Sequence, residues 1–271
     1  MRIIIISFLC LFLSHSFGQG YAPAGSRSMS MANASVAFND VWSYHNNPGA
    51  MADVDHFSVA ISYENRFLLK EMQNQAFAVA IPLKVGVISI GGHFYGYSQY
   101  RSVKAGAGYS LKLSEKLYAG VQLNYQGLQL SNNYGAKNTL TAEAGIYAKI
   151  TEKWKLGISV FNLGRAKLSD FQDDRFSTTL RLGSAYHFSK KLILSGEFDK
   201  DLDNDLRFKV GVDYELLDRF FVRGGFATSP TEVTFGFGYH FKQIHLNVGS
   251  AYNHVLGWSP NFSLLFRSKS K

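Results

Sequence analysis

The sequence predicts an all-β fold, a fourteen-stranded antiparallel transmembrane barrel with a small amino-terminal plug in its lumen. Three observations lead to this prediction. Apolar and polar residues alternate with a period of two along most of the chain after Phe57. Short and longer connections alternate along the chain, as in membrane barrels that have tight turns at one end and longer loops at the other. The chain holds 22 Phe, 15 Tyr and 3 Trp, and many lie near segment ends, which is typical of interfacial aromatic girdles.

The first residues predict export. A positive residue, Arg2, precedes an apolar run, and Ser16 and Gly18 are the small residues expected before a cleavage point. The run is shorter than the roughly 20 residues that a membrane-spanning helix needs. We therefore expect a signal peptide over residues 1–18, a hatch segment over 19–54 and a barrel over 55–271. Cys10 is the only cysteine, so the mature chain is expected to have no disulfide.

The net charge of +8 does not predict nucleic-acid binding. Lys and Arg are dispersed, and most lie in turns or alternate with apolar residues, whereas nucleic acid requires a clustered basic patch.

Alternation is clearest in the middle of the chain. Leu117, Ala119 and Val121 share one face of a predicted strand, and Gly120 and Gln122 lie on the other. Counting such segments gives fourteen strands, which start near Phe57, Asn74, Gly86, Tyr100, Leu117, Asn138, Trp154, Phe176, Leu192, Leu206, Phe220, Glu232, Ile244 and Ser259.

Turn lengths favour a membrane barrel over a soluble sandwich. The connections after even-numbered strands are tiny, as at Lys84-Val85, Asp218-Arg219 and Lys242-Gln243, whereas several connections after odd-numbered strands are longer. Outer-membrane barrels place short turns at the periplasmic end and longer loops outside the cell.

The stretch from Gly25 to Val54 lacks strand alternation and is rich in Ala, Ser, Asn and Met. A barrel of fourteen strands is wider than the eight-stranded kind that wall side chains fill, so its lumen needs other contents. We expect this stretch to lie inside the barrel. The alternative is a disordered arm, which would leave Val36, Phe38 and Trp42 in water.

Two motifs in this stretch carry a family resemblance. Asp40-Val41-Trp42 precedes Asn47-Pro48-Gly49-Ala50-Met51-Ala52. Repeated downstream stretches such as AGAGYSLKLSEKLYAGVQLNY carry the same resemblance. The whole mature chain resembles the FadL-like outer-membrane barrels, and is most similar to the branch that contains the PorV and PorQ proteins of the type IX secretion system. The chain departs from the pattern of that family in two places: Ala and Gly are exchanged in the second motif, and a basic tail follows Phe266.

The resemblance implies a hatch inside the lumen and a location in the outer membrane of a Gram-negative, Bacteroidetes-like bacterium. Carried over position by position, the hatch motif comprises Asp40, Trp42, Asn46, Asn47, Pro48 and Gly49.

Polar and charged side chains are expected to line the lumen, because they fall on the face opposite the apolar one. They either form a path for a solute or a network that joins barrel and hatch. Mixed signs on adjacent strands favour the network. The residues are Glu143, Arg181, Glu197, Arg207, Asp213, Arg223 and His240.

Enzyme chemistry is not predicted. His240 and His245 lie on neighbouring predicted strands and face inward, but no Gly-x-Ser-x-Gly elbow accompanies them. The sequence has no metal-ligand spacing and no phosphate-binding loop. We therefore expect no catalytic residue, no metal and no cofactor.

Two functions remain open beside contact with outer-membrane lipid. The first, implied by the PorV and PorQ resemblance, is a component or partner-holding subunit of a protein secretion assembly. The second is FadL-like uptake of hydrophobic small molecules, through an apolar pocket beside the hatch and a strand kinked at Gly91-Gly92. In the first, the longest outer loop would contact a translocon or a secreted protein through Arg165, Lys167, Asp170, Phe171 and Asp173.

Overall fold

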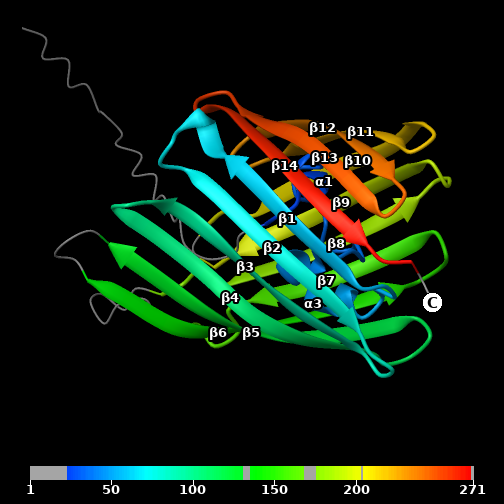
Figure 1. Ribbon diagram of the computed structural model, residues 1–271, viewed down its shortest axis with the longest axis horizontal. Helices are drawn as coiled ribbons and strands as arrows, with labels where there is room; N and C mark the ends of the chain where they lie inside the picture. The colour runs from blue at the N-terminus through cyan, green and yellow to red at the C-terminus, as the bar shows by residue number, and fades with distance from the viewer. Residues whose placement is uncertain (1–22, 131–134, 168–174, 203, 270–271) are drawn as a thin grey trace, which may run out of the picture.

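Fourteen antiparallel strands close into one barrel in the order of the chain, with β1 paired to β14 (Figure 1). The computed structural model describes residues 23–130, 135–167, 175–202 and 204–269. The strands are β1 (Ser58–Asn65), β2 (Gln73–Pro82), β3 (Val87–Tyr97), β4 (Tyr100–Lys112), β5 (Leu117–Leu130), β6 (Ala136–Lys149), β7 (Trp154–Phe161), β8 (Thr179–His187), β9 (Leu192–Asp201), β10 (Arg207–Leu217), β11 (Phe220–Ala227), β12 (Glu232–Phe241), β13 (Ile244–Asn253) and β14 (Gly257–Arg267). The fold class, the strand number and the order are as predicted, and every strand begins within three residues of its expected start.

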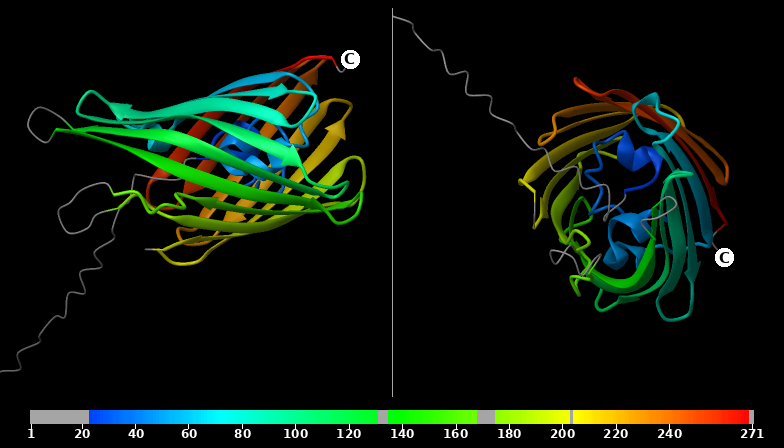
Figure 2. Two further views of the ribbon diagram at one scale, coloured as in Figure 1. Left: turned by 90° about the horizontal axis from the view of Figure 1, so that it is seen from below. Right: turned by 90° about the vertical axis from the view of Figure 1, so that its left-hand side faces the viewer.

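The two ends of the barrel differ. Each connection after an even-numbered strand has two or four residues, whereas those after odd-numbered strands range from two residues at Ser98-Gln99 to the seventeen of 162–178. Strands β4, β5 and β6 are the longest and extend furthest at the end with the longer loops (Figure 2). The predicted signal peptide and part of the predicted partner-contact loop, residues 168–174, lie outside the described residues.

The wall has an apolar outer face and a polar inner face. Outward-facing Val121, Leu123 and Leu140 are 61%, 68% and 73% exposed, whereas inward-facing Gln122 and Glu143 are 1% and 3% exposed. This alternation is what a strand between lipid and a filled lumen requires. No helix among the described residues is long and apolar enough to cross a bilayer.

One expectation about the wall is wrong. Strand β3 pairs residue by residue with β2 and β4 through Gly91 and Gly92, without a break in either ladder. A continuous ladder has no lateral gap, so the strand is not opened by a kink there. Gly91 instead gives room to the ring of Tyr44, since a Cβ at Gly91 would lie 2.6 Å from that ring.

The described part of the predicted hatch segment, residues 23–54, is called the inner segment below. It lies within the ring of strands (Figure 2) and contains α1 (Ser26–Met29), α2 (Ser43–Asn46) and α3 (Pro48–Met51). A fourth short helix, η1 (Arg66–Leu68), belongs to the connection between β1 and β2. The inner segment packs on the wall of β1 and β2 through Trp42, Met51 and Val54, which meet inward-facing alanines at positions 60, 76, 78 and 80.

Candidate functional site: the barrel lumen and the inner segment

Pairs of facing glycines receive the backbone of the inner segment. Gly120 of β5 pairs with Gly145 of β6, and a Cβ added to either would collide with Asn47, Pro48 or Gly49. Glycine is needed here because any side chain would occupy the space of the inner segment. Three more directly paired sets also face the inner segment: Gly157 with Gly183 meets Val36, Gly211 with Gly225 meets Met31, and Gly236 with Gly249 meets the side chain of Ser30.

A buried carboxylate on β9 holds the turn of the inner segment before Ala37. Glu197 accepts hydrogen bonds from the backbone N–H groups of Ser35 and Val36, both at 2.9 Å. It also accepts from the Arg181 guanidinium at 2.7 and 2.9 Å, and from Lys209 Nζ at 3.1 Å. Arg181 in turn donates to the Asn46 carbonyl at 2.7 Å. The network therefore joins β8, β9 and β10 to two parts of the inner segment.

A second network holds α1. Arg27 donates to Asp213 of β10 at 3.0 Å and to Asp40 at 3.2 Å, and its guanidinium lies 4.6 Å from the centre of the Phe38 ring. Asp213 also accepts from Arg223 of β11 at 2.9 Å. Burial lowers the pKa of Arg27, but the two carboxylates outweigh it and raise that pKa above its ordinary value. Arg27 is therefore a permanent cation.

A third network lies around α2. Lys104 of β4 forms a buried ion pair with Glu143 of β6, and Lys104 Nζ lies 5.8 Å from the centre of the Tyr44 ring. The Tyr44 hydroxyl donates to the Gly91 carbonyl at 2.8 Å. Burial lowers the pKa of His45 well below its ordinary value, and Lys104 lowers it further. His45 is therefore neutral, and its Nε2 donates to the Phe77 carbonyl at 3.1 Å.

The residues of the predicted hatch motif form the bend into α3. Asn47 Oδ1 accepts from the backbone N–H of Gly49 at 2.9 Å, so its side chain caps α3. Its Nδ2 donates to the Val36 carbonyl at 2.7 Å and to the Ile146 carbonyl of β6 at 3.0 Å. Pro48 occupies the first turn of α3, where its missing N–H leaves no bond unmade.

The remaining residues of the motif, Asn46, Asp40 and Trp42, make contacts within the inner segment. Asn46 donates to Ser28 Oγ at 3.2 Å, and Asp40 accepts from the backbone N–H of Trp42 at 2.9 Å. Trp42 is 1% exposed.

The expected lumen residues face inward. Glu143, Arg181, Glu197, Asp213 and Arg223 are each 3% exposed or less and take part in the networks above. Arg207 lies near the end with the longer loops, where it pairs with Glu232 at 2.7 Å. At the opposite end His240 is paired with His245, and their ring centres are 3.8 Å apart.

A pocket of about 420 Å³ lies between the inner segment and the wall at the short-turn end. This volume falls within the range of small-molecule sites, roughly 300–1,000 Å³. The lining is mixed, and its apolar side chains include Val41, Trp42, Val54, Phe221 and Leu265. Its polar and charged side chains include Arg27, Asp40, Lys149, Asp213, His240 and His245. An apolar pocket was expected for a hydrophobic solute, whereas this pocket has a mixed lining, because the ion pairs of α1 reach into it.

The predicted contact loop is described only in part. Arg165 and Lys167 are at its start, where Lys167 forms an isolated bridge with Arg175, and the Arg165 carbonyl accepts from Arg175 at 2.8 Å. Asp170, Phe171 and Asp173 lie outside the described residues.

The sequence did not predict a role for Tyr44. It also did not predict that the facing glycines would contact the inner segment. A signal for the glycines was present, because glycine recurs on the polar face of the alternation in most strands. Alternation places Lys209 on the inward face as well, but its contact with Glu197 depends on strand register. Within the described part of the chain, no group of three or more His, Cys, Asp or Glu side chains could hold a metal ion.

No family model matches the chain, and no curated protein matches its sequence. Solved structures do match its fold. The CymD monoaromatic hydrocarbon channel has a TM-score of 0.71 at 11% identity, covering 90% of this chain and 97% of that one. The toluene transporter TbuX of Ralstonia pickettii has a TM-score of 0.68 at 11% identity, covering 93% and 99%. A FadL homologue of Pseudomonas aeruginosa has a TM-score of 0.66 at 12% identity, covering 93% and 100%. The fold of this chain is therefore that of the FadL-type outer-membrane barrels.

Proposed function

We propose that this chain is a non-enzymatic outer-membrane barrel that admits small hydrophobic molecules through its lumen. The observation that carries the proposal is the pocket of about 420 Å³ beside Trp42, whose mixed lining includes the apolar side chains of Val41, Trp42, Val54, Phe221 and Leu265. The fold similarity to a monoaromatic hydrocarbon channel and a toluene transporter supports the same class of solute.

The position of the pocket suits the last stage of entry. It lies on the short-turn side of the inner segment, which faces the periplasm in outer-membrane barrels. An apolar solute would pack against Trp42 and its neighbours, since contact with apolar side chains removes its surface from water. The charged lining residues, with Arg27 and Asp213 paired to each other, keep part of the pocket hydrated. The solute is then bound weakly enough to leave.

Uptake of labelled toluene into cells that contain or lack the protein tests this proposal. A Val54→Trp variant fills the pocket with a larger lining side chain and is expected to abolish the protein-dependent part of the uptake. Val85→Trp is the matched control, because Val85 is 67% exposed in a short turn outside the pocket. Equal uptake with and without the protein would refute the proposal, and so would full uptake by a correctly folded Val54→Trp barrel.

A second candidate is a PorV- or PorQ-like subunit that holds a partner in a protein secretion assembly. The inner segment favours it, because contacts with Glu197, Asp213 and paired glycines all around the wall suit a permanent plug. Partners would bind the outer loops near Arg165 and Lys167. This candidate requires a co-purifying partner in mild detergent and a changed set of secreted proteins in a deletion strain. Isolation of the barrel alone, with unchanged secretion, would exclude it.

A further inference from the structure

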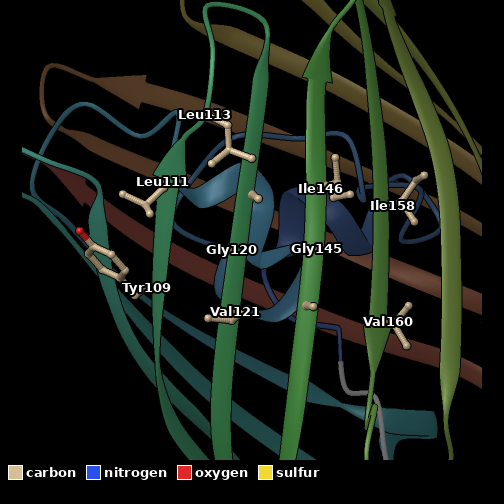
Figure 3. A pocket seen from close by; sticks show the side chains of 11 residues that line it. Tyr109, Leu111, Leu113, Gly120, Val121, Gly145, Ile146, Ile158 and Val160 are labelled. Atoms are coloured by element: carbon tan, nitrogen blue, oxygen red, sulfur yellow. The ribbon is translucent and has the colours of Figure 1, made fainter.

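The outer wall carries a hollow at the same place where α3 rests on its inner side. The hollow has a volume of about 380 Å³ and lies over β4, β5, β6 and β7 (Figure 3). Its floor is thin because Ala119, Gly120, Ala144 and Gly145 present no large side chain. The surrounding apolar side chains include those of Tyr109, Leu111, Leu113, Val121, Ile146 and Ile158. The result is an apolar groove on the lipid-facing surface.

The groove ends at one short turn, which it reaches through Leu113, and a second short turn lies beside the first; each carries a glutamate and a lysine. Leu113, which lines it, leads directly into Ser114-Glu115-Lys116, and β6 leads into Thr151-Glu152-Lys153. The two turns are adjacent, because the backbone N–H of Lys149 donates to the Lys116 carbonyl at 2.8 Å. Residues 114–116 and 151–153 are all exposed. Among the described residues, neither lysine forms an ion pair.

We propose that this groove binds a phospholipid of the periplasmic leaflet whose headgroup carries a phosphate and a primary amine, of the phosphatidylethanolamine type. An acyl chain lies in the groove, where it fills a hollow that would otherwise lack packing contacts. Lys116 and Lys153 bind the phosphate, and Glu115 and Glu152 bind the amine. The turns lie at the headgroup level of that leaflet, because the short-turn end of an outer-membrane barrel is periplasmic.

The kind of headgroup follows from the charges of the two turns, each of which has a glutamate followed by a lysine. Two lysines alone would prefer an anionic lipid. With a glutamate next to each lysine, a headgroup that holds both charges matches the surface better. A quaternary amine has no N–H to donate to the glutamates, so phosphatidylcholine is expected to bind less well.

The test uses the full-length mature barrel, stripped of lipid in detergent and supplied with one lipid at a time. Native mass spectrometry then measures the fraction of barrels that retain a lipid. Phosphatidylethanolamine is expected to be retained at lower concentration than phosphatidylglycerol or phosphatidylcholine. Substituting both lysines, K116Q with K153Q, is expected to weaken its retention about tenfold.

A second variant tests the groove itself. Ala119→Leu with Ala144→Leu fills the floor and is expected to abolish retention. Ala107→Leu is the control, because Ala107 is an exposed, outward-facing residue of β4 that does not line the groove. Folding of each variant is checked by heat-dependent gel mobility. Unchanged retention by the filled groove would overturn the proposal, as would equal retention of all three lipids or no retention by the native barrel. None of these outcomes depends on whether a solute crosses the lumen.

Discussion

Gly120 and Gly145 face each other across β5 and β6, and the backbone of Pro48 and Gly49 rests on both. With four such pairs around the wall, the inner segment approaches the strands closely at points where a wall side chain would collide with it, in addition to the side-chain networks that hold it. The barrel and the inner segment are therefore fitted to each other at fixed points, and each point can be tested by adding a single methyl group.

Gly145→Ala places a Cβ in contact with Asn47 Oδ1 and the backbone N–H of Gly49. Overpacking of this kind costs about 1–3 kcal/mol, so we expect a lower unfolding temperature. The midpoint of heat-dependent gel mobility measures it. Gly164→Ala is the control, because nothing lies within 4 Å of its Cβ position. Identical midpoints for the two variants would show that the contact at Gly145 contributes nothing.

Substitutions of Asn47 distinguish its capping of α3 from its anchoring of the inner segment to the wall. Asn47→Asp keeps an oxygen to cap α3 but removes the N–H groups that bond to the Val36 and Ile146 carbonyls. A carboxylate beside two carbonyl oxygens is repelled, and its desolvation is uncompensated. We expect Asn47→Asp to destabilise the barrel at least as much as Asn47→Ala and to expose the inner segment to protease. A variant as resistant to protease as the native barrel would contradict the anchoring role.

Glu197 is the most connected carboxylate in the lumen. Glu197→Gln removes the carboxylate that Arg181 and Lys209 share, although Lys209 Nζ keeps Asp199 at 2.6 Å; breaking a buried ion pair of this kind costs about 3–5 kcal/mol. Glu232→Gln is the matched control, because its pair with Arg207 is partly exposed and such pairs contribute about 0–1 kcal/mol. Chemical denaturation of both variants in detergent gives the two values. Similar losses would mean that the Glu197 network is no stronger than a surface ion pair.

The inner segment is expected to remain seated while solute passes. Cys10 is the only native cysteine and belongs to the predicted signal peptide, so introduced cysteines can be paired without interference. The backbone N–H of Ser26 donates to Ser263 Oγ at 3.1 Å, which places both residues in contact. A Ser26→Cys, Ser263→Cys disulfide should leave uptake of labelled toluene unchanged, with the single-cysteine variants as controls. Loss of uptake that a reductant restores would instead identify the inner segment as a gate.

The outer wall could be predicted almost completely, because period-two alternation and turn length are local properties of the sequence. The strand from Leu117 and the turn at Lys242-Gln243 are where the pattern placed them. The least accurate start was that of β8, expected near Phe176 and found at Thr179. Phe176 is 3% exposed in the long connection, so its apolar character comes from burial there and not from a lipid-facing strand.

The interior was predicted only in outline. The inward direction of Arg181 and Glu197 follows from alternation, but their contacts with residues 33–36 and 46 depend on how the inner segment folds. That path is set by non-local packing on the wall, which no short stretch of sequence encodes. Gly91 is an example, since it suggested a kink in β3 but accommodates the Tyr44 ring.

Binding of a small apolar molecule beside Trp42 is the central claim, and fluorescence tests it most directly. In a Trp154→Phe, Trp258→Phe barrel, Trp42 is the only tryptophan left of three. Bromobenzene is expected to quench its emission to a plateau, and toluene to reverse the quenching, because both compete for the pocket. A barrel that retains only the exposed Trp154 should instead respond linearly, as the compound dissolves in the detergent. Absent quenching of Trp42, or linear quenching that toluene does not reverse, would contradict the account.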